Sequence, residues 1–192
     1  MIIVKRVIRN NIFETNSSSS HSLVITKNTN RYLTFEEAKR NIQYNYDEET
    51  GIYEFPWSED KYTFNRFPFK VLQEFEDKML FLYANAPRRA RIAKDGYTSY
   101  NAEYYKVTRY IGKYCIPGFK GIKLPRDRYD RPSCEAYNVL ETLKRNNISW
   151  YEFLMNPNII VICDGDEYCV WYDMKKLNLI TNIEKEIKFL GG

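Results

Sequence analysis

The sequence contains few of the residues on which common metal, catalytic and nucleotide-binding sites depend. Its 192 residues include one histidine, four cysteines and eight glycines. The cysteines form no C-x-x-C pair, and the only other soft ligand, the single histidine, is far from them in the sequence, so we expect no zinc site. No P-loop, dinucleotide-binding glycine pattern, zincin motif, EF-hand loop or G-x-S-x-G elbow is present. These absences exclude only the families that require those motifs.

Long apolar runs are also lacking. No stretch approaches the roughly 18 apolar residues of a membrane-spanning helix, so we expect no membrane segment. The first residues hold only four apolar side chains before Lys5 and Arg6, which is not the pattern of a secretion signal. We therefore expect a cytoplasmic protein with reduced thiols.

What is present is a composition typical of a folded domain. Hydrophobic residues make up 44% of the chain and aromatic residues 16%, which excludes a disordered composition. The length suits a single globular domain spanning residues 1–192. No internal repeat is visible, and the only low-complexity stretch is a run of four serines.

The net charge of +4 conceals a segregation along the chain. Residues 88–131 hold 12 Lys and Arg against 4 Asp and Glu, a local charge of +8 that leaves −4 for the rest. Residues 47–60 hold six acids and no Lys or Arg. The two segments are expected to face different partners, or each other.

The strand and helix patterns predict an α+β (mixed) fold with a central, mostly antiparallel sheet, a C-terminal β-hairpin and three to four packed helices. Enrichment in β-branched and aromatic residues favours strands at 2–8, 21–26, 52–55, 61–64 and 120–124. The apolar run at 158–163 predicts a strand buried on both faces, joined by a turn to a second hairpin arm at 168–172. Residues 183–190 suit either a helix or an edge strand.

Helices are predicted from caps and from apolar spacing. Thr34 with Glu37, and Ser149 with Glu152, match the capping box, which predicts short helices after each. The first should end near Asn41. Further helices are expected at 101–114 and 133–146. The strongest helix is expected to open at Pro68, with an apolar stripe of Val71, Leu72, Phe75, Met79, Leu82 and Tyr83.

The first candidate site is the serine run that ends at the only histidine. Small hydroxyl residues allow amides and Oγ donors to converge on an oxyanion, and an imidazole can move a proton near neutral pH. Strand alternation would place His21 on the same face as Ser19, with Ser20 and Ser22 on the opposite face. The alternative is a flexible connection that leads into a strand. The residues of this site are Asn16, Ser17, Ser18, Ser20 for binding, and Ser19, His21, Ser22 for catalysis.

The second candidate site is the basic, tyrosine-rich middle of the chain. On a helix over 101–114, Lys106, Arg109 and Lys113 fall within about 60° of one another, flanked by Tyr105 and Tyr110. Cations beside aromatic rings suit phosphate backbones and unpaired bases. The alternative is a solvated face whose charges pair with the acids of 47–60. The helix should bury Tyr104, Val107, Ile111 and Tyr114, and the arginines Arg88, Arg89 and Arg91 would extend the basic patch.

The third candidate site is acidic and lies at the tip of the expected hairpin. Asp164 and Asp166 flank Gly165, and carboxylates so close together can hold Mg²⁺ with substrate phosphates. Asp-Gly is also ordinary hairpin-turn chemistry. The turn is the favoured interpretation, and we expect no cofactor.

A resemblance adds context to these motifs. The stretch I-F-E-T-N-S-S-S-S-H-S-L-V-I at 12–25 resembles the N-terminal signature of an uncharacterised protein family of bacteriophages and mobile elements in low-GC Gram-positive bacteria. F-L-M-N-P at 153–157, followed by 159–166, extends it weakly. Family members carry a D-H-Q-S-like stretch where this chain has P-S-C-E at 132–135, which argues against a second histidine site. The resemblance implies a phage accessory protein in the cytoplasm of a bacterial host.

Three functions follow as hypotheses. The leading one is a protein directed at nucleic acid or a nucleotide through the basic patch, with phosphotransfer or phosphodiester chemistry at His21 if it is an enzyme. The alternative is a non-catalytic, anti-CRISPR-like anti-defence inhibitor that binds a host protein or nucleoprotein through tyrosine and arginine. A structural or virion-associated role ranks last.

Overall fold

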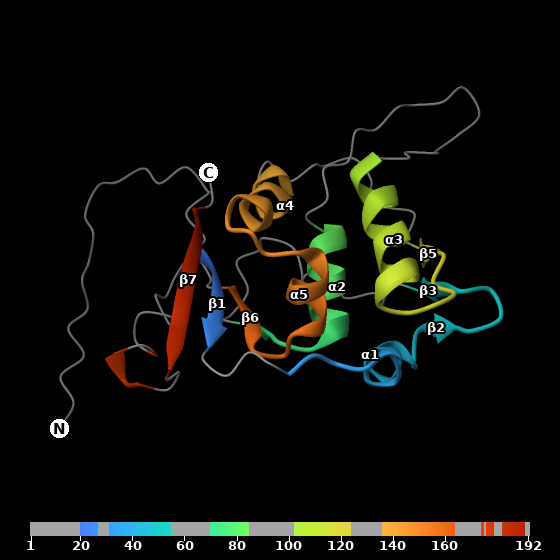
Figure 1. Ribbon diagram of the computed structural model, residues 1–192, viewed down its shortest axis with the longest axis horizontal. Coiled ribbons are helices and arrows are strands. Elements are labelled where there is room, and N and C mark those ends of the chain that lie inside the picture. The colour runs from blue at the N-terminus through green and yellow to red at the C-terminus, as the bar shows by residue number, and fades with distance from the viewer. Residues whose placement is uncertain are drawn as a thin grey trace, which may run out of the picture.

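The computed structural model describes residues 20–26, 31–54, 70–84, 102–123, 136–163, 174, 176–178 and 182–190. These residues form an α+β fold (Figure 1). The helices are α1 (Phe35–Ile42), α2 (Phe75–Ala84), α3 (Ala102–Tyr114), α4 (Ala136–Arg145) and α5 (Trp150–Met155). The strands are β1 (Ser20–Thr26), β2 (Tyr46–Asp47), β3 (Ile52–Glu54), β4 (Lys70–Leu72), β5 (Gly121–Lys123), β6 (Ile159–Cys163) and β7 (Ile183–Leu190).

The larger sheet is antiparallel throughout, in the order β4-β6-β1-β7. On β1, Leu23 and Ile25 enter the main core, whereas Val24 packs with Ile162 of β6 on the opposite face. This alternation places apolar side chains on both sides of the strand. The same holds for β6, so the prediction of a strand buried on both faces is confirmed.

The partners of β6 come from distant parts of the chain. Between Val161 and Cys163 one edge of β6 pairs with β1 and the other with β4. These residues therefore have no free edge for the hairpin arm expected at 168–172, which lies outside the described residues. Residues 183–190 were predicted to form either a helix or an edge strand. They form the strand β7, which pairs with β1 and is last in the strand order of this sheet.

A second, smaller sheet was not anticipated as a separate unit. Its order is β2-β3-β5, with β2 antiparallel and β5 parallel to β3. Gly51, at a φ of +72°, makes the turn into β3, and its carbonyl oxygen accepts a hydrogen bond from the amide of Lys120 at 2.7 Å. The expected strands at 2–8 and 61–64 lie outside the described residues.

Side-chain caps fix two helices where the sequence placed them. The hydroxyl of Thr34 accepts from the amide of Glu37, and the Glu37 carboxylate accepts from the amide of Thr34, which completes the predicted capping box of α1. The hydroxyl of Ser149 accepts from the amide of Glu152 at the start of α5. Both predicted helix starts are confirmed, with the complete capping box at α1 and only the Ser149 half of it at α5.

The start predicted for α2 was wrong. Val71 and Leu72 belong to β4, which pairs with β6, and the helix begins only at Phe75. The side-chain oxygen of Asn41, at the end of α1, accepts a hydrogen bond from the amide of Phe75 at 2.9 Å. An amide of the first turn is thus satisfied by a distant side chain.

The core is built around α2, which contacts α1, α3, α4 and α5. Glu76 and Asp77 are partly exposed, but six of the ten side chains are large, apolar or aromatic, and at most 1% exposed: Phe75, Met79, Leu80, Phe81, Leu82 and Tyr83. In Figure 1 it stands between the larger sheet and α3. No described helix is long and apolar enough to cross a membrane.

Two polar groups anchor α2 to its surroundings. The ammonium group of Lys78, fully buried, donates to the carbonyl oxygen of Asn156 at 2.8 Å and to that of Ile159 at 3.4 Å. Burial lowers the pKa of Lys78 to about 7, although Glu74 acts in the opposite direction. The hydroxyl of Tyr53 on β3 donates to the Glu76 carboxylate at 2.6 Å. These contacts tie α2 to the α5–β6 turn and to the smaller sheet.

Lys78 makes the stability of the fold depend on pH. The unfolded chain keeps its lysine proton up to about pH 10.5, whereas the folded chain loses it from about pH 7. The unfolded state therefore binds more protons between these values, and the free energy of unfolding rises with pH across this window. We expect the wild type to gain stability relative to Lys78→Met over this range, measured by urea unfolding of both proteins. Lys144→Met, at an exposed position of α4, controls for the lost charge. A difference that is constant with pH would contradict the assignment.

Candidate nucleic-acid interface

The orientation of α3 is set by the residues that it buries. Val107 and Ile111 are fully buried, and Thr108 is 6% exposed. The hydroxyl groups of Thr108 and Tyr83 on α2 form a buried hydrogen bond of 2.7 Å. Because one face of α3 is fixed against α2, the opposite face must be turned to solvent. The predicted helix at 101–114 is confirmed to within one residue.

The outward face of α3 carries the predicted cations, together with an exposed ring. Lys106, Arg109 and Lys113 are exposed, Tyr105 is 52% exposed and Tyr110 is half-buried. The guanidinium carbon of Arg109 lies 5.8 Å from the centroid of the Tyr105 ring. We call Tyr105, Lys106, Arg109 and Lys113 the α3 strip. The structure brings together on one helix face the residues that the sequence assigned to it.

One residue of α3 departs from the prediction. Tyr114 was expected on the buried side, but it is 41% exposed. Its ring lies 4.8 Å from the ammonium nitrogen of Lys113 and 4.7 Å, centroid to centroid, from the ring of Tyr110. The buried sector of α3 is centred on Val107 and Ile111, so Tyr114 falls at its margin, next to the strip.

The strip continues into a row of aromatic rings from other elements. Tyr110 packs edge-on against Trp150 of α5, with ring centroids 5.3 Å apart. The Tyr110 hydroxyl accepts a hydrogen bond from the amide of Tyr151 at 3.2 Å. The Tyr151 ring lies 5.6 Å from that of Tyr32. We call Tyr114, Tyr110, Trp150, Tyr151 and Tyr32 the aromatic row.

The sequence did not reveal this row. Tyr32, Trp150 and Tyr151 are far from residues 101–114 in the chain, and only the docking of α5 beside α3 joins them. The one local signal was the pair of aromatic residues, Trp150 and Tyr151, directly after the cap at Ser149. Side chains in the first turn of a short helix lie near the end of that helix, where they can meet residues of another element. Burial raises the pKa of Tyr110, against the opposing effect of its bond to Tyr151.

The described acids of the segment 47–60 do not pair with Arg109 or Lys113. Glu48 pairs with Lys39 at 2.8 Å, and Glu54 pairs with Lys123 at 2.9 Å. The hydroxyl and amide of Thr50 and the amide of Glu49 donate to Asp47, which lowers the pKa of its carboxyl group. No carboxylate among the described residues forms an ion pair with Arg109 or Lys113.

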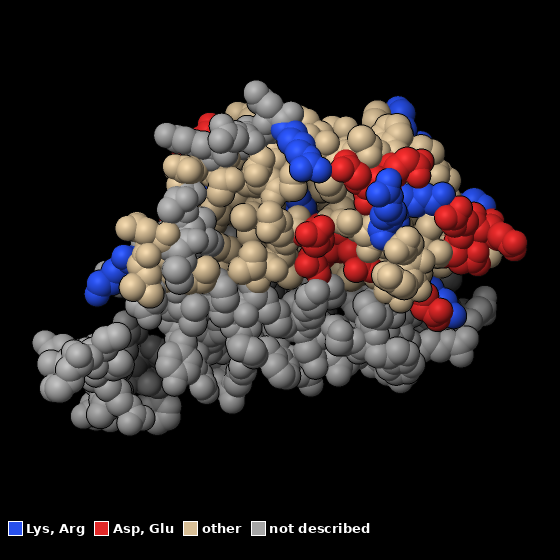
Figure 2. All heavy atoms as spheres, turned by 90° about the horizontal axis from the view of Figure 1, so that it is seen from below, with Lys and Arg blue, Asp and Glu red and all other residues tan. Residues whose placement is uncertain are grey.

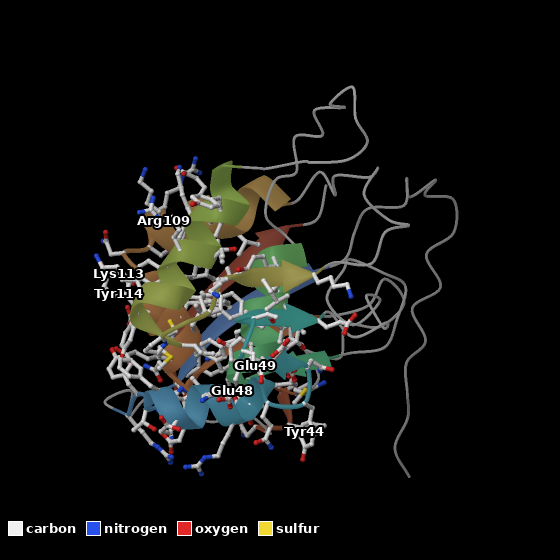
Figure 3. All side chains as sticks on the ribbon, turned by 90° about the vertical axis from the view of Figure 1, so that its right-hand side faces the viewer. Tyr44, Glu48, Glu49, Arg109, Lys113 and Tyr114 are labelled. Atoms are coloured by element: carbon white, nitrogen blue, oxygen red, sulfur yellow. The ribbon has the colours of Figure 1, made fainter. Side chains whose placement is uncertain are left out.

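Figure 3 agrees with this separation. It shows Arg109, Lys113 and Tyr114 along one side of α3, and Glu48 and Glu49 on another part of the surface. The face seen from below in Figure 2 differs, because its Asp and Glu side chains are interspersed with Lys and Arg. Carboxylates mixed with cations are expected to compensate one another locally.

Only the backbone of Ser20, His21 and Ser22 from the serine-run site is described. These residues lie on β1, where His21 is paired with Cys163 on one side and Phe189 on the other. Their side chains, and all of Asn16, Ser17, Ser18 and Ser19, lie outside the described residues. In Figure 1, α2 and α5 stand between β1 and α3. The catalytic role of His21 stays a prediction.

The remaining candidates contribute no described site. Arg88, Arg89, Arg91, Asp164 and Asp166 lie outside the described residues. Within the described ranges, no group of three or more His, Cys, Asp or Glu side chains is placed to hold a metal ion. Cys115 is a free, buried thiol, and burial raises its pKa to about 12, which makes it a poor nucleophile.

Comparison of the chain with models of known protein families, with curated proteins and with solved structures finds no match in any of the three. The resemblance of residues 12–25 to a phage protein family therefore stays a prediction.

The hydrogen bond to Tyr110 predicts a measurable contribution to stability. Tyr110→Phe keeps the ring but leaves the amide of Tyr151 without its acceptor, so we expect a loss of about 1 kcal/mol in the free energy of unfolding. Urea unfolding measures it. The matched control is Tyr105→Phe, because the exposed Tyr105 hydroxyl forms no hydrogen bond within the described residues. Equal stability of the two variants would contradict this role.

Proposed function

We propose that this protein binds nucleic acid through the α3 strip, with Lys106, Arg109 and Lys113 contacting successive phosphates. The observation that carries the proposal is the pair Arg109 and Lys113, which are exposed on a fixed helix face and form no ion pair with a described carboxylate. Phosphate contacts from such side chains supply most of the affinity of non-specific nucleic-acid binding.

The shape of the strip favours a polymer over a mononucleotide. Arg109 and Lys113 are four residues apart on a helix, about 6 Å along its axis. A polyanion that presents phosphates in series can meet both, whereas a single nucleotide is usually held in a concave pocket. A helix surface is convex. The polymer is therefore the ligand that the strip fits better.

The alternative function, inhibition of a host protein or nucleoprotein, uses the same residue types. Tyr, Trp and Arg are also enriched in protein interfaces. The two functions differ in their dependence on salt, because phosphate contacts release condensed counterions and contacts with a protein groove do not. Salt dependence is therefore the measurement that separates them.

Removal of two charges from the strip should weaken binding in a defined way. For the variant Arg109→Gln with Lys113→Gln, we expect weaker binding of a labelled single-stranded DNA at every salt concentration. The slope of log affinity against log salt should become shallower by about 1.4, at roughly 0.7 for each lost contact with a single strand. Fluorescence anisotropy across a salt series measures both quantities.

A matched control removes the same net charge elsewhere. Lys39 and Lys123 are already paired with Glu48 and Glu54, so Lys39→Gln with Lys123→Gln should leave the slope unchanged. An equal loss in both double variants would mean that net charge alone drives binding, and the strip would lose its role. Wild-type binding that ignores salt would favour a protein partner instead.

A further inference from the structure

Two exposed rings bracket the cations of the strip. Tyr105 is 52% exposed at one end of the exposed face, and Tyr114 is 41% exposed at the other. They are nine positions apart on the helix, which is about 13.5 Å along its axis. Phosphate binding alone requires neither ring to be in solvent. Two exposed rings beside cations therefore favour a ligand that has planar, apolar groups as well as negative charge.

Each exposed ring has a cation beside it. Arg109 lies over Tyr105 at 5.8 Å, and Lys113 lies over Tyr114 at 4.8 Å. The same unit of one ring and one cation thus occurs twice along α3. In a single strand each nucleotide likewise offers one planar base and one phosphate. Each unit thus places a ring suited to a base next to a cation suited to a phosphate.

The Tyr114 ring is supported from the side of the aromatic row. It contacts Tyr110, which contacts Trp150 and is hydrogen-bonded to the amide of Tyr151. A ring held in this way loses little freedom when a base stacks on it. The row ends at Tyr32, 42% exposed and 5.6 Å from Tyr151, which offers a third ring beyond the strip.

Unpaired bases can stack on these two rings, whereas paired bases cannot. In a duplex the flat faces of the bases are stacked on one another, so only phosphates and base edges remain for a protein surface. In a single strand the faces are free to stack on aromatic side chains. We propose that the strip binds single-stranded nucleic acid in preference to duplex, with bases stacked on Tyr105 and Tyr114. This specificity rests on the proposed function and adds the ligand class to it.

The test compares three probes of equal length on the wild-type protein. They are a fluorescein-labelled single-stranded DNA of mixed sequence, the same strand annealed to its complement, and an abasic strand with the same number of phosphates. We expect the intact single strand to bind at least tenfold more tightly than either of the others, because stacking on even one ring has about this effect on affinity.

Ring-deleting variants locate the effect. Tyr105→Leu with Tyr114→Leu should lose about tenfold or more in affinity for the single strand and little for the duplex. Tyr105→Phe with Tyr114→Phe keeps both rings and should bind as the wild type does. Tyr44→Leu is the matched control, because Tyr44 is 89% exposed and Figure 3 shows it away from Tyr114.

The outcomes separate the two proposals. Equal affinity for the single strand, the duplex and the abasic strand would overturn the stacking proposal and leave the phosphate-binding function standing. Binding of none of the three would overturn both. A loss with Tyr44→Leu equal to that of the double leucine variant would also overturn the assignment to Tyr105 and Tyr114.

Discussion

The burial of most of α2 is the constraint from which the rest of the structure follows. Glu76 and Asp77 are only partly buried, whereas Lys78 is fully buried, so its ammonium group must find acceptors within the core. It finds them in the carbonyl groups of Asn156 and Ile159. This places the end of α5 and the start of β6 against α2. Because α5 is held there, Trp150 reaches Tyr110, and the aromatic row can form.

The same constraint gives α3 its outward face. Val107, Ile111 and Thr108 are needed to cover α2, which leaves Arg109 and Lys113 on the far side of the helix. Three of the four described acids of 47–60 have partners elsewhere: Glu48 pairs with Lys39, Glu54 pairs with Lys123, and Asp47 accepts from Thr50. The positive potential of the strip is therefore a result of packing as much as of composition. The basic segment of the sequence forms a basic surface because packing against α2 determines which face of α3 is covered.

Local signals in the sequence were sufficient for some elements and not for others. The caps at Thr34 and Ser149, the apolar run of β6 and the exposed face of α3 are encoded within a few residues each, so they could be predicted. The start of α2 could not, because Val71 has helical spacing but its strand is fixed by β6, and the amide of Phe75 is satisfied by Asn41. The exposure of Tyr114 and the ring of Tyr32 depend on where α5 docks. Contacts between elements that are distant in the chain leave no pattern in the neighbouring sequence, so they could not be predicted from it.

The position of β1 has a consequence for how the chain reaches its native state. Ser20 is paired with Leu190, so the first and last described strands are neighbours in one sheet. During synthesis β1 emerges well before β7 and cannot pair with it until the residues between them have been made. Pairing over such a separation carries a large loop-closure entropy and slows folding. Until then this edge of β1 is unpaired, and unpaired strand edges make folding intermediates prone to aggregation.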